Sequence, residues 1–414
     1  MIWALVARTP VFSRFGAFRS ASLALAGCLI MAATPGSAQA ASCHGGATFA
    51  QWLQGVRADA AAQGISQGTI NSALGSVRFD PGVVKRDRGQ GVFSQSFLQF
   101  SDRMVNQYRL DHGRRHLSGK KALFDRIEQQ YGVPGPVLVA FWALETDFGA
   151  NTGDFPTLTA LASLAYDCRR PDLFREQLIS ALKIIDRGDL TAAQMRGAWA
   201  GELGQTQFLP KDYFETAVDF DGSGRRDLIG SSADALASSA ALLRKHGWRP
   251  NEPWLQEVRA PGSIPWDQAD IAIQHPRSYW ARQGVTRIDG SALPADGLPA
   301  SLLLPMGRNG PAFLAYPNFQ VYLQWNRSLV YATTAAYLAT RLAGEPKVSR
   351  GNAAALSRAQ IIELQKALVA RGYNVGKVDG ILGKNTRAAV KAVQTQLGLP
   401  ADSYPTADLI RRLQ

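Results

Sequence analysis

The chain contains little cysteine, little histidine and little charge. Of 414 residues, three are cysteine and five are histidine, and charged residues make up 19%. No CxxC pair occurs and the histidines are scattered, which excludes a zinc site with the usual ligand spacing. Hydrophobic residues make up 46%, which excludes a disordered chain. The length allows two or three domains with a sizeable core.

Long apolar runs are also lacking, and no stretch is long enough to span a bilayer. The only charged residues before position 41 are Arg8, Arg14 and Arg19. An apolar run at 21–33 follows them, and then a Pro-Gly breaker and an A-x-A site that ends at Ala40. This order is typical of a secretory signal peptide. It predicts a signal peptide at 1–40 and export to the periplasm.

A second interpretation of this segment stays open. The residues LAGC, which end at Cys28, are similar to a bacterial lipoprotein box and would anchor the mature chain through that cysteine. Against the anchor, the apolar run continues past Cys28, where lipoproteins usually turn small or polar.

The net charge is +12, from 45 Lys and Arg against 33 Asp and Glu. A basic balance indicates an anionic partner, which can be a nucleic acid, a membrane surface or an acidic polymer. Export argues against nucleic acid.

The cysteines allow one disulfide in the exported protein. If Cys28 leaves with the signal, Cys43 and Cys168 remain, and an oxidising compartment favours a bridge between them. Two separate thiols are the alternative.

The pattern of apolar residues predicts a mainly α (α+β) protein. Helical spacing dominates residues 49–245, short strands and loops are expected at roughly 250–320, and a helix at about 328–342. Residues 345–356 are small, polar and unpatterned, which predicts a linker. Residues 357–414 form a separate small helical module, which leaves 41–344 as the main domain.

Glu145 is the first candidate for catalysis. It lies near the end of a helix expected between Pro134 and Gly149, among aromatic residues. Desolvation raises the pKa of a carboxyl group, as a general acid near neutral pH requires. On this segment alone, a Glu on a solvated helix face is the favoured interpretation. Asp147 is two residues on, so the two carboxylates would not face each other on a helix.

Two other segments carry groups that could bind sugars. The turn GELGQTQFLP holds the amides of Gln205 and Gln207, and the segment NFQVYLQWNRSLVY holds Trp325, Asn326 and Tyr331. Amides can bind hydroxyl or N-acetyl groups, and aromatic rings can stack on sugar faces. A plain polar turn and a junction with core aromatics are the alternatives.

The segment DFDGSGRRD resembles part of an EF-hand loop. Asp219, Asp221, Ser223 and Asp227 occupy positions 1, 3, 5 and 9. Position 12 is Gly230, so the bidentate carboxylate is missing. A structural Ca²⁺ site and a solvated Asp/Gly turn both remain open.

In their order along the chain, these segments resemble the membrane-bound lytic murein transglycosylase B family. The resemblance covers most of residues 48–344. It rests on VVKRDRGQGVF (83–93), ALETDFG (143–149), AYDCRRPDLF (165–174), GQTQFLP (204–210), AVDFDGSG (217–224), DALASSAALLRKHGW (234–248), GPAFLAYPNF (310–319) and WNRSLVYA (325–332). The segment 364–394 resembles a small peptidoglycan-binding module.

The resemblance implies a role for each matching residue. Glu145 matches the single catalytic acid/base. The other matches are residues of the substrate groove, namely Gln207, Asn326, Tyr331, Arg169 and Arg170. Trp325 stands where the family often has Tyr, which predicts stacking without a hydroxyl. Ala198 stands where some members have Ser.

The resemblance also implies a fold and an activity. We expect a lysozyme-like helical domain with a short-stranded insertion, followed by a three-helix module. The expected reaction cleaves the bond between N-acetylmuramic acid and N-acetylglucosamine and forms a 1,6-anhydro ring, with no cofactor required. A hydrolytic muramidase and a non-catalytic wall-binding protein are the alternatives. The expected partners are peptidoglycan glycan strands and other cell-wall enzymes, with no nucleic acid, and the protein is expected to be a monomer.

Overall fold

The computed structural model describes residues 44–89 and 95–414. The predicted signal peptide, Cys28 and Cys43 lie outside these residues. Within the described ranges, no helix is long and apolar enough to cross a membrane. Cys168 is disulfide-bonded, which rules out a free thiol at that position. Its pairing with Cys43 stays a prediction.

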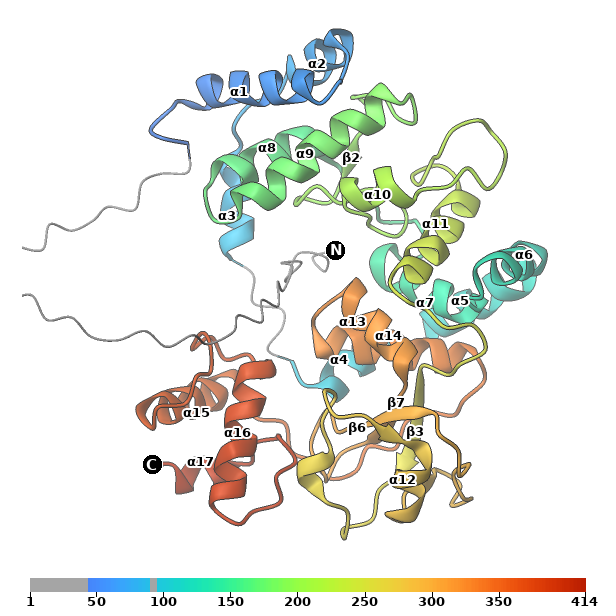
Figure 1. Ribbon diagram of the computed structural model, residues 1–414, viewed down its shortest axis with the longest axis vertical. Coiled ribbons are helices and arrows are strands. Elements are labelled where there is room, and N and C mark those ends of the chain that lie inside the picture. Colours follow the sequence, from blue (N-terminus) through green and yellow to red (C-terminus); the bar gives the residue numbers. More distant parts are fainter. Residues whose placement is uncertain (1–43, 90–94) are drawn as a thin grey trace, which may run out of the picture.

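Helices form the first part of the described chain, as the apolar periodicity predicts (Figure 1). Their bounds are α1 Phe49–Ala62, α2 Gln67–Leu74, α3 Pro81–Arg88, α4 Phe97–Met104, α5 Gln107–Gly119, α6 Lys121–Tyr131, α7 Gly135–Thr146, α8 Thr157–Tyr166, α9 Pro171–Asp186, α10 Pro210–Thr216 and α11 Ser232–Lys245. Two short antiparallel strands, β1 (Phe155–Pro156) and β2 (Arg196–Gly197), lie among them. The fold class is therefore mainly helical, as expected.

Helix α7 lies in the centre of the largest core. It is apolar on every side, and nearly all of its residues are buried, as expected for a helix with neighbours all round. It packs against α5, α6, α11 and the later helix α14 (Leu329–Leu342). Gly113 on α5 permits close approach, because a Cβ there would lie 2.7 Å from Leu342 and 3.2 Å from Val139.

The strands expected at 250–320 form one antiparallel sheet in the order β4-β6-β7-β3-β5. The elements of this insertion are β3 Leu255–Arg259, a 3-10 turn Trp266–Gln268, β4 His275–Pro276, α12 Arg277–Arg282, β5 Thr286–Arg287, β6 Pro299–Leu303 and β7 Ala312–Ala315. A separate core, which includes Trp280 and Leu302, supports it. After β7 the chain returns to the helical domain through α13 (Pro317–Trp325) and α14.

The C-terminal module consists of α15 (Arg358–Ala370), α16 (Lys384–Gln396) and α17 (Ala407–Arg412). Its own core includes Leu364, Leu368 and Val390. A capping box at Ser357 and Gln360 starts α15. The module is thus the small helical unit that the sequence predicts.

The segment 345–356 differs from the open linker that its composition suggests. Val348 is buried, and its N–H donates to the hydroxyl of Tyr337. Ser349 donates its backbone N–H to Glu257 at 2.8 Å, and Arg350 pairs with Asp102 at 2.8 Å. Small polar residues thus lie along the domain surface, held by hydrogen bonds that an apolar pattern does not reveal.

The module also contacts the loop between β6 and β7. Arg387 on α16 donates to the carbonyl oxygens of Pro305 at 2.6 Å and Leu304 at 3.4 Å. The buried carboxylate of Asp402 accepts from the backbone N–H of Arg308 at 3.0 Å. The helical module and the insertion therefore lie side by side, as Figure 1 shows.

Candidate active site

Glu145 lies in the last turn of α7 and is only 3% exposed. A Glu on a solvated helix face would be exposed, so that alternative is wrong. The helix can hold a carboxylate here because aromatic and aliphatic residues surround it and polar groups from distant segments reach it. Both of the polar contacts described next come from residues at least 180 positions away.

Two side chains donate hydrogen bonds to the same oxygen of Glu145. The indole Nε1 of Trp325 donates to Oε1 at 3.0 Å, and the hydroxyl of Tyr331 donates to Oε1 as well. Tyr331 is fully buried at the start of α14. Burial, with a further contribution from the charge of Glu145, raises the pKa of Tyr331 well above its ordinary value, so the phenol keeps its proton.

Trp325 makes contacts other than the sugar stacking expected from the sequence. Its ring stacks on Phe141 at 4.3 Å between centroids and meets Phe208 edge-on at 5.8 Å. It is 6% exposed, so little of the ring remains for a ligand. Trp325 lacks the hydroxyl of the tyrosine that the family often has here, but its indole N–H points at the carboxylate of Glu145 and donates to it.

Asp147 lies beyond the end of α7 in the left-handed region, with φ of 49°. It pairs with Arg109 at 2.7 Å, and Arg109 also donates to the carbonyl oxygen of Ala143 at 3.2 Å. A cation at a helix C-terminus is favourable. Asp147 is therefore committed to an ion pair that ties α5 to the end of α7. Sequence reasoning missed Arg109.

The two glutamines lie in a tight turn against α7. Thr146 donates its hydroxyl to the carbonyl oxygen of Gln205 at 2.5 Å. Gln205 donates its amide to the Ile229 carbonyl at 3.0 Å, and Gln207 donates its amide to the carbonyls of Thr152 and Gly204, also at 3.0 Å. The amide nitrogens thus fix the turn.

Asn326 follows α13 directly and is buried. Its side-chain oxygen accepts from the backbone N–H of Ser328 at 2.9 Å. This bond shapes the short turn that places Trp325 before it and Tyr331 after it.

Arg169 and Arg170 converge on one buried carboxylate, Asp87 of α3. Arg169 donates to it at 2.5 Å through Nε, and Arg170 donates at 2.5 Å through a terminal nitrogen. Burial lowers the pKa of Arg170. Asp87 was not singled out from the sequence, although it lies within the motif at 83–93. It balances part of the charge of the arginine pair.

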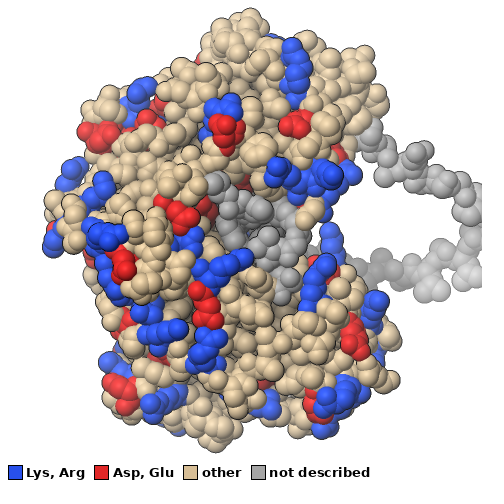
Figure 2. Space-filling model, turned by 180° about the vertical axis from the view of Figure 1, so that it is seen from behind, with Lys and Arg blue, Asp and Glu red and all other residues tan. Residues whose placement is uncertain are grey.

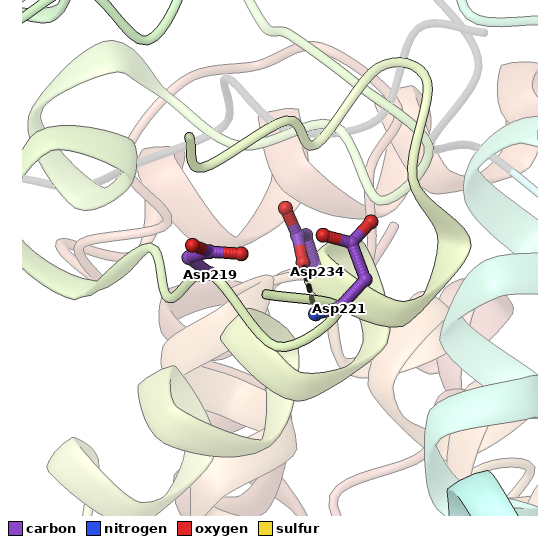
Figure 3. A group of neighbouring side chains, drawn as sticks. All are labelled: Asp219, Asp221 and Asp234. Atoms are coloured by element: carbon purple, nitrogen blue, oxygen red, sulfur yellow. Dashed lines mark hydrogen bonds between the residues drawn. The ribbon is translucent and has the colours of Figure 1, made fainter. Parts of the chain in front are cut away.

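The predicted calcium loop brings together a different set of acids (Figure 3). Carboxylate oxygens of Asp219, Asp221 and Asp234 lie within 4.8 Å of one another. Asp227 is not in this group, and its Oδ1 accepts from the N–H groups of Ile229 and Gly230 at 3.0 and 2.7 Å.

Asp234 supplies a carboxylate from the first turn of α11 that the loop spacing did not predict. Burial raises its pKa, although hydrogen bonds from three backbone N–H groups act in the opposite direction. Hard carboxylate oxygens are the ligands that Ca²⁺ takes, so the group fits a calcium ion, with other oxygens needed to complete six to eight ligands.

The basic charge does not form one stripe on the face drawn in Figure 2, where Asp and Glu lie among the Lys and Arg side chains. This distribution differs from the continuous basic track that backbone binding to nucleic acid uses.

Comparison with known families gives two matches. The family model for the transglycosylase SLT domain matches residues 48–340, and that for a peptidoglycan binding domain matches residues 357–413.

Among curated proteins, the chain is similar to membrane-bound lytic murein transglycosylase B of Escherichia coli (strain K12). The two are 28% identical over 243 residues, which is 57% of this chain and 64% of that protein. The chain thus matches somewhat less than two thirds of the length of this relative.

Solved structures resemble the whole arrangement. SltB3 from Pseudomonas aeruginosa, solved with NAG-NAM-pentapeptide and with NAG-anhNAM-pentapeptide, is 40% and 41% identical in the two structures, with TM-scores of 0.83 and 0.82. Each match covers 89% of this chain and 100% of SltB3. The Escherichia coli lytic transglycosylase Slt35 in complex with calcium is 25% identical, with a TM-score of 0.59, and covers 70% of this chain and 92% of its own.

Proposed function

The chain belongs to the transglycosylase SLT domain family, and from this membership we propose that it is a peptidoglycan lytic transglycosylase. The observation that carries the proposal is the buried carboxylate of Glu145, which two donors hold at the end of a central helix. The complexes of SltB3 with a NAG-NAM peptide and with its anhydro counterpart support the substrate class.

The proposed reaction uses one carboxyl group twice. Glu145 gives its proton to the glycosidic oxygen as the bond from C1 of N-acetylmuramic acid breaks. The carboxylate then takes the proton of the C6 hydroxyl, whose oxygen bonds to C1 and closes the 1,6-anhydro ring. No water is consumed, so the second carboxylate of ordinary glycosidases is not needed. The neighbouring N-acetyl group of the substrate can shield the charge that develops at C1.

The test is the digestion of purified sacculi by wild-type protein and by Glu145→Gln. General acid/base help contributes typically about 10²–10⁴-fold, so the variant should release anhydromuropeptides at least ~100-fold more slowly. Glu257→Gln is the matched control, because Glu257 is also partly buried and hydrogen-bonded but lies on β3 of the insertion. Near-wild-type release by Glu145→Gln would overturn the assignment.

The hydrolytic alternative predicts a different product. A muramidase adds water, so mass spectrometry would find reducing muropeptides that are heavier than the anhydro product by one water. The non-catalytic alternative predicts binding to sacculi without any soluble product. One digestion thus separates all three functions.

We also propose that the protein acts in the periplasm, as the predicted signal peptide suggests. Fractionation of cells that express the full chain tests this, and radiolabelled palmitate would reveal an anchor at Cys28. Sedimentation of the mature protein tests whether it is a monomer.

A structural calcium ion is the last part of the proposal. Asp219, Asp221 and Asp234 would hold it, and it would stiffen the loop before α11 without taking part in the reaction. Addition of CaCl₂ to metal-free protein should raise the melting temperature, because a ligand that binds the native state stabilises it. Asp221→Asn should abolish the rise, and Asp227→Asn, outside the group, should retain it. No calcium-dependent shift in the wild type would refute the site.

A further inference from the structure

The two hydrogen bonds to Glu145 share one acceptor. Trp325 and Tyr331 both donate to Oε1, although they come from the end of α13 and the start of α14. A carboxylate oxygen has two lone-pair sites in the carboxyl plane. Two accepted hydrogen bonds occupy both sites on Oε1, so that oxygen has no ordinary position for a proton.

Neither donor can reverse its role. An indole N–H donates and never accepts. Tyr331 could accept in principle, but its surroundings strongly favour the protonated phenol. The arrangement therefore persists whether Glu145 is charged or neutral, and in the neutral form Oε1 is the carbonyl oxygen.

We propose that Trp325 is a positioning residue that, together with Tyr331, confines the acid proton of Glu145 to Oε2. This inference rests on the proposed function. The same oxygen then performs both transfers: Oε2 gives its proton to the glycosidic oxygen as the C1–O bond breaks, and Oε2 takes the C6 hydroxyl proton as the new C1–O bond forms. Oε1 accepts hydrogen bonds throughout, and no further reactant is needed.

The packing of Trp325 explains how the indole holds this direction. Phe141, which belongs to the same helix as Glu145, stacks on the indole ring, and Phe208 meets the ring edge-on. Because protein interiors are close-packed, the ring cannot swing away without disturbing both neighbours. A donor held this firmly is prearranged and needs no reorientation during the reaction.

Two other ionisable groups are near enough to influence Tyr331, which donates to the carboxylate. Arg109 from α5 affects Tyr331 electrostatically but pairs with Asp147 at 2.7 Å, which offsets its charge. Tyr322 of α13 stacks on Phe141 and is a neutral phenol whose pKa burial raises. Both groups are present in the wild type and in the Trp325 variants, so the comparison between these proteins isolates the lost indole bond.

The test compares Trp325→Phe, Trp325→Tyr and Trp280→Phe in the full mature chain on a soluble glycan substrate. Trp325→Phe keeps an aromatic ring but loses the donor. We expect kcat to fall about 10- to 100-fold with KM changed less than about threefold, since a hydrogen bond to a charged group contributes about 1.5–3 kcal/mol. Trp325→Tyr, the residue that the family often has there, should recover part of the loss.

The pH profile gives a readout that a purely structural role would not move. Without the indole donor the charged carboxylate is less favoured, so the basic limb of kcat should move up by about half to one pH unit in Trp325→Phe. Trp280 is the control, because its buried indole donates to Ala300 at 2.9 Å in the separate core of the insertion. Trp280→Phe should leave the profile unchanged.

The outcomes separate this inference from the proposed function. Full activity of Glu145→Gln would remove the proposed function itself. An inactive Glu145→Gln beside a Trp325→Phe with wild-type kcat and pH profile would overturn the positioning role alone. A neutron structure at low pD should place the deuteron on Oε2, and a deuteron on Oε1 would also overturn it.

Discussion

Replacement of Arg387 tests whether the C-terminal module is docked or merely tethered. Its guanidinium donates to the carbonyls of Pro305 and Leu304 and lies over the ring of Tyr404 at 5.6 Å. Burial lowers the pKa of Arg387, because the surroundings solvate its charge poorly. Arg387→Ala removes both hydrogen bonds and leaves two carbonyl groups without this donor.

The magnitude follows from these contacts. The bond at 2.6 Å is strong and the one at 3.4 Å is weak, so roughly one full charge-assisted bond is lost, about 1.5–3 kcal/mol. The stacking on Tyr404 lies within the module and persists when the module opens, so it does not count here, and relief from burying the charge offsets part of the total. A net loss of about 1–2 kcal/mol shifts the docking equilibrium toward the open form by roughly 5- to 30-fold.

Limited proteolysis within 345–356 measures the open form. When opening is fast relative to cleavage, the cleavage rate follows the open population, so Arg387→Ala should be cut faster by a similar factor. Arg371→Ala is the control, because Arg371 is an exposed residue whose side chain bonds only within α15. Truncation after Gly344 should then lower both the melting temperature and activity on short glycans. Equal cleavage of wild type and Arg387→Ala would show that the module is only tethered.

Three further predictions address the turn, the disulfide and pH. Gly204→Ala should destabilise by about 2–4 kcal/mol in urea unfolding, because φ is +78° and a Cβ would lie 2.5 Å from the Leu228 carbonyl; an unchanged midpoint would contradict this. In the unreduced exported protein, Cys43 and Cys168 should resist alkylation, and a labelled thiol at either would refute the bridge. Burial is the main cause that lowers the pKa of His116 below 6.5, and the charge of Lys120 lowers it further. The unfolded state therefore binds more protons than the folded state. Stability should therefore fall as pH drops below about 6.5, and His116→Gln should remove that part of the slope in unfolding measured at pH 7.5 and 5.5.

Part of this architecture follows from interactions between residues that are neighbours in the sequence. Pro134 marks the start of α7, although the helix ends at Thr146, three residues before Gly149. The apolar spacing in 357–414 marks the helices of the module, because caps and periodicity act over a few residues. The expected helix at 328–342 begins one residue later, at Leu329, after its Ser328 cap. Ordered motifs also indicated the family and the candidate residues.

Position along the chain does not reveal which groups meet in space. The sequence left Glu145 open between a solvated face and a buried site, and burial among segments about 180 residues away decided it. Local spacing chose Asp227 for the calcium group, whereas the fold brings in Asp234 from the next helix. Such contacts form where the turns of the chain bring distant segments together.

The same limit applies to Trp325 and to the segment 345–356. The sequence predicts a stacking ring at Trp325 and an open linker at 345–356. The direction of an indole N–H and the partners of small polar residues depend on the surfaces packed against them. Sequence by itself determined the helices and the order of the motifs, and it singled out Glu145 as the candidate acid. Only tertiary packing decided which oxygen of that acid is held, because hydrogen bonds form between atoms that folding brings within about 3 Å.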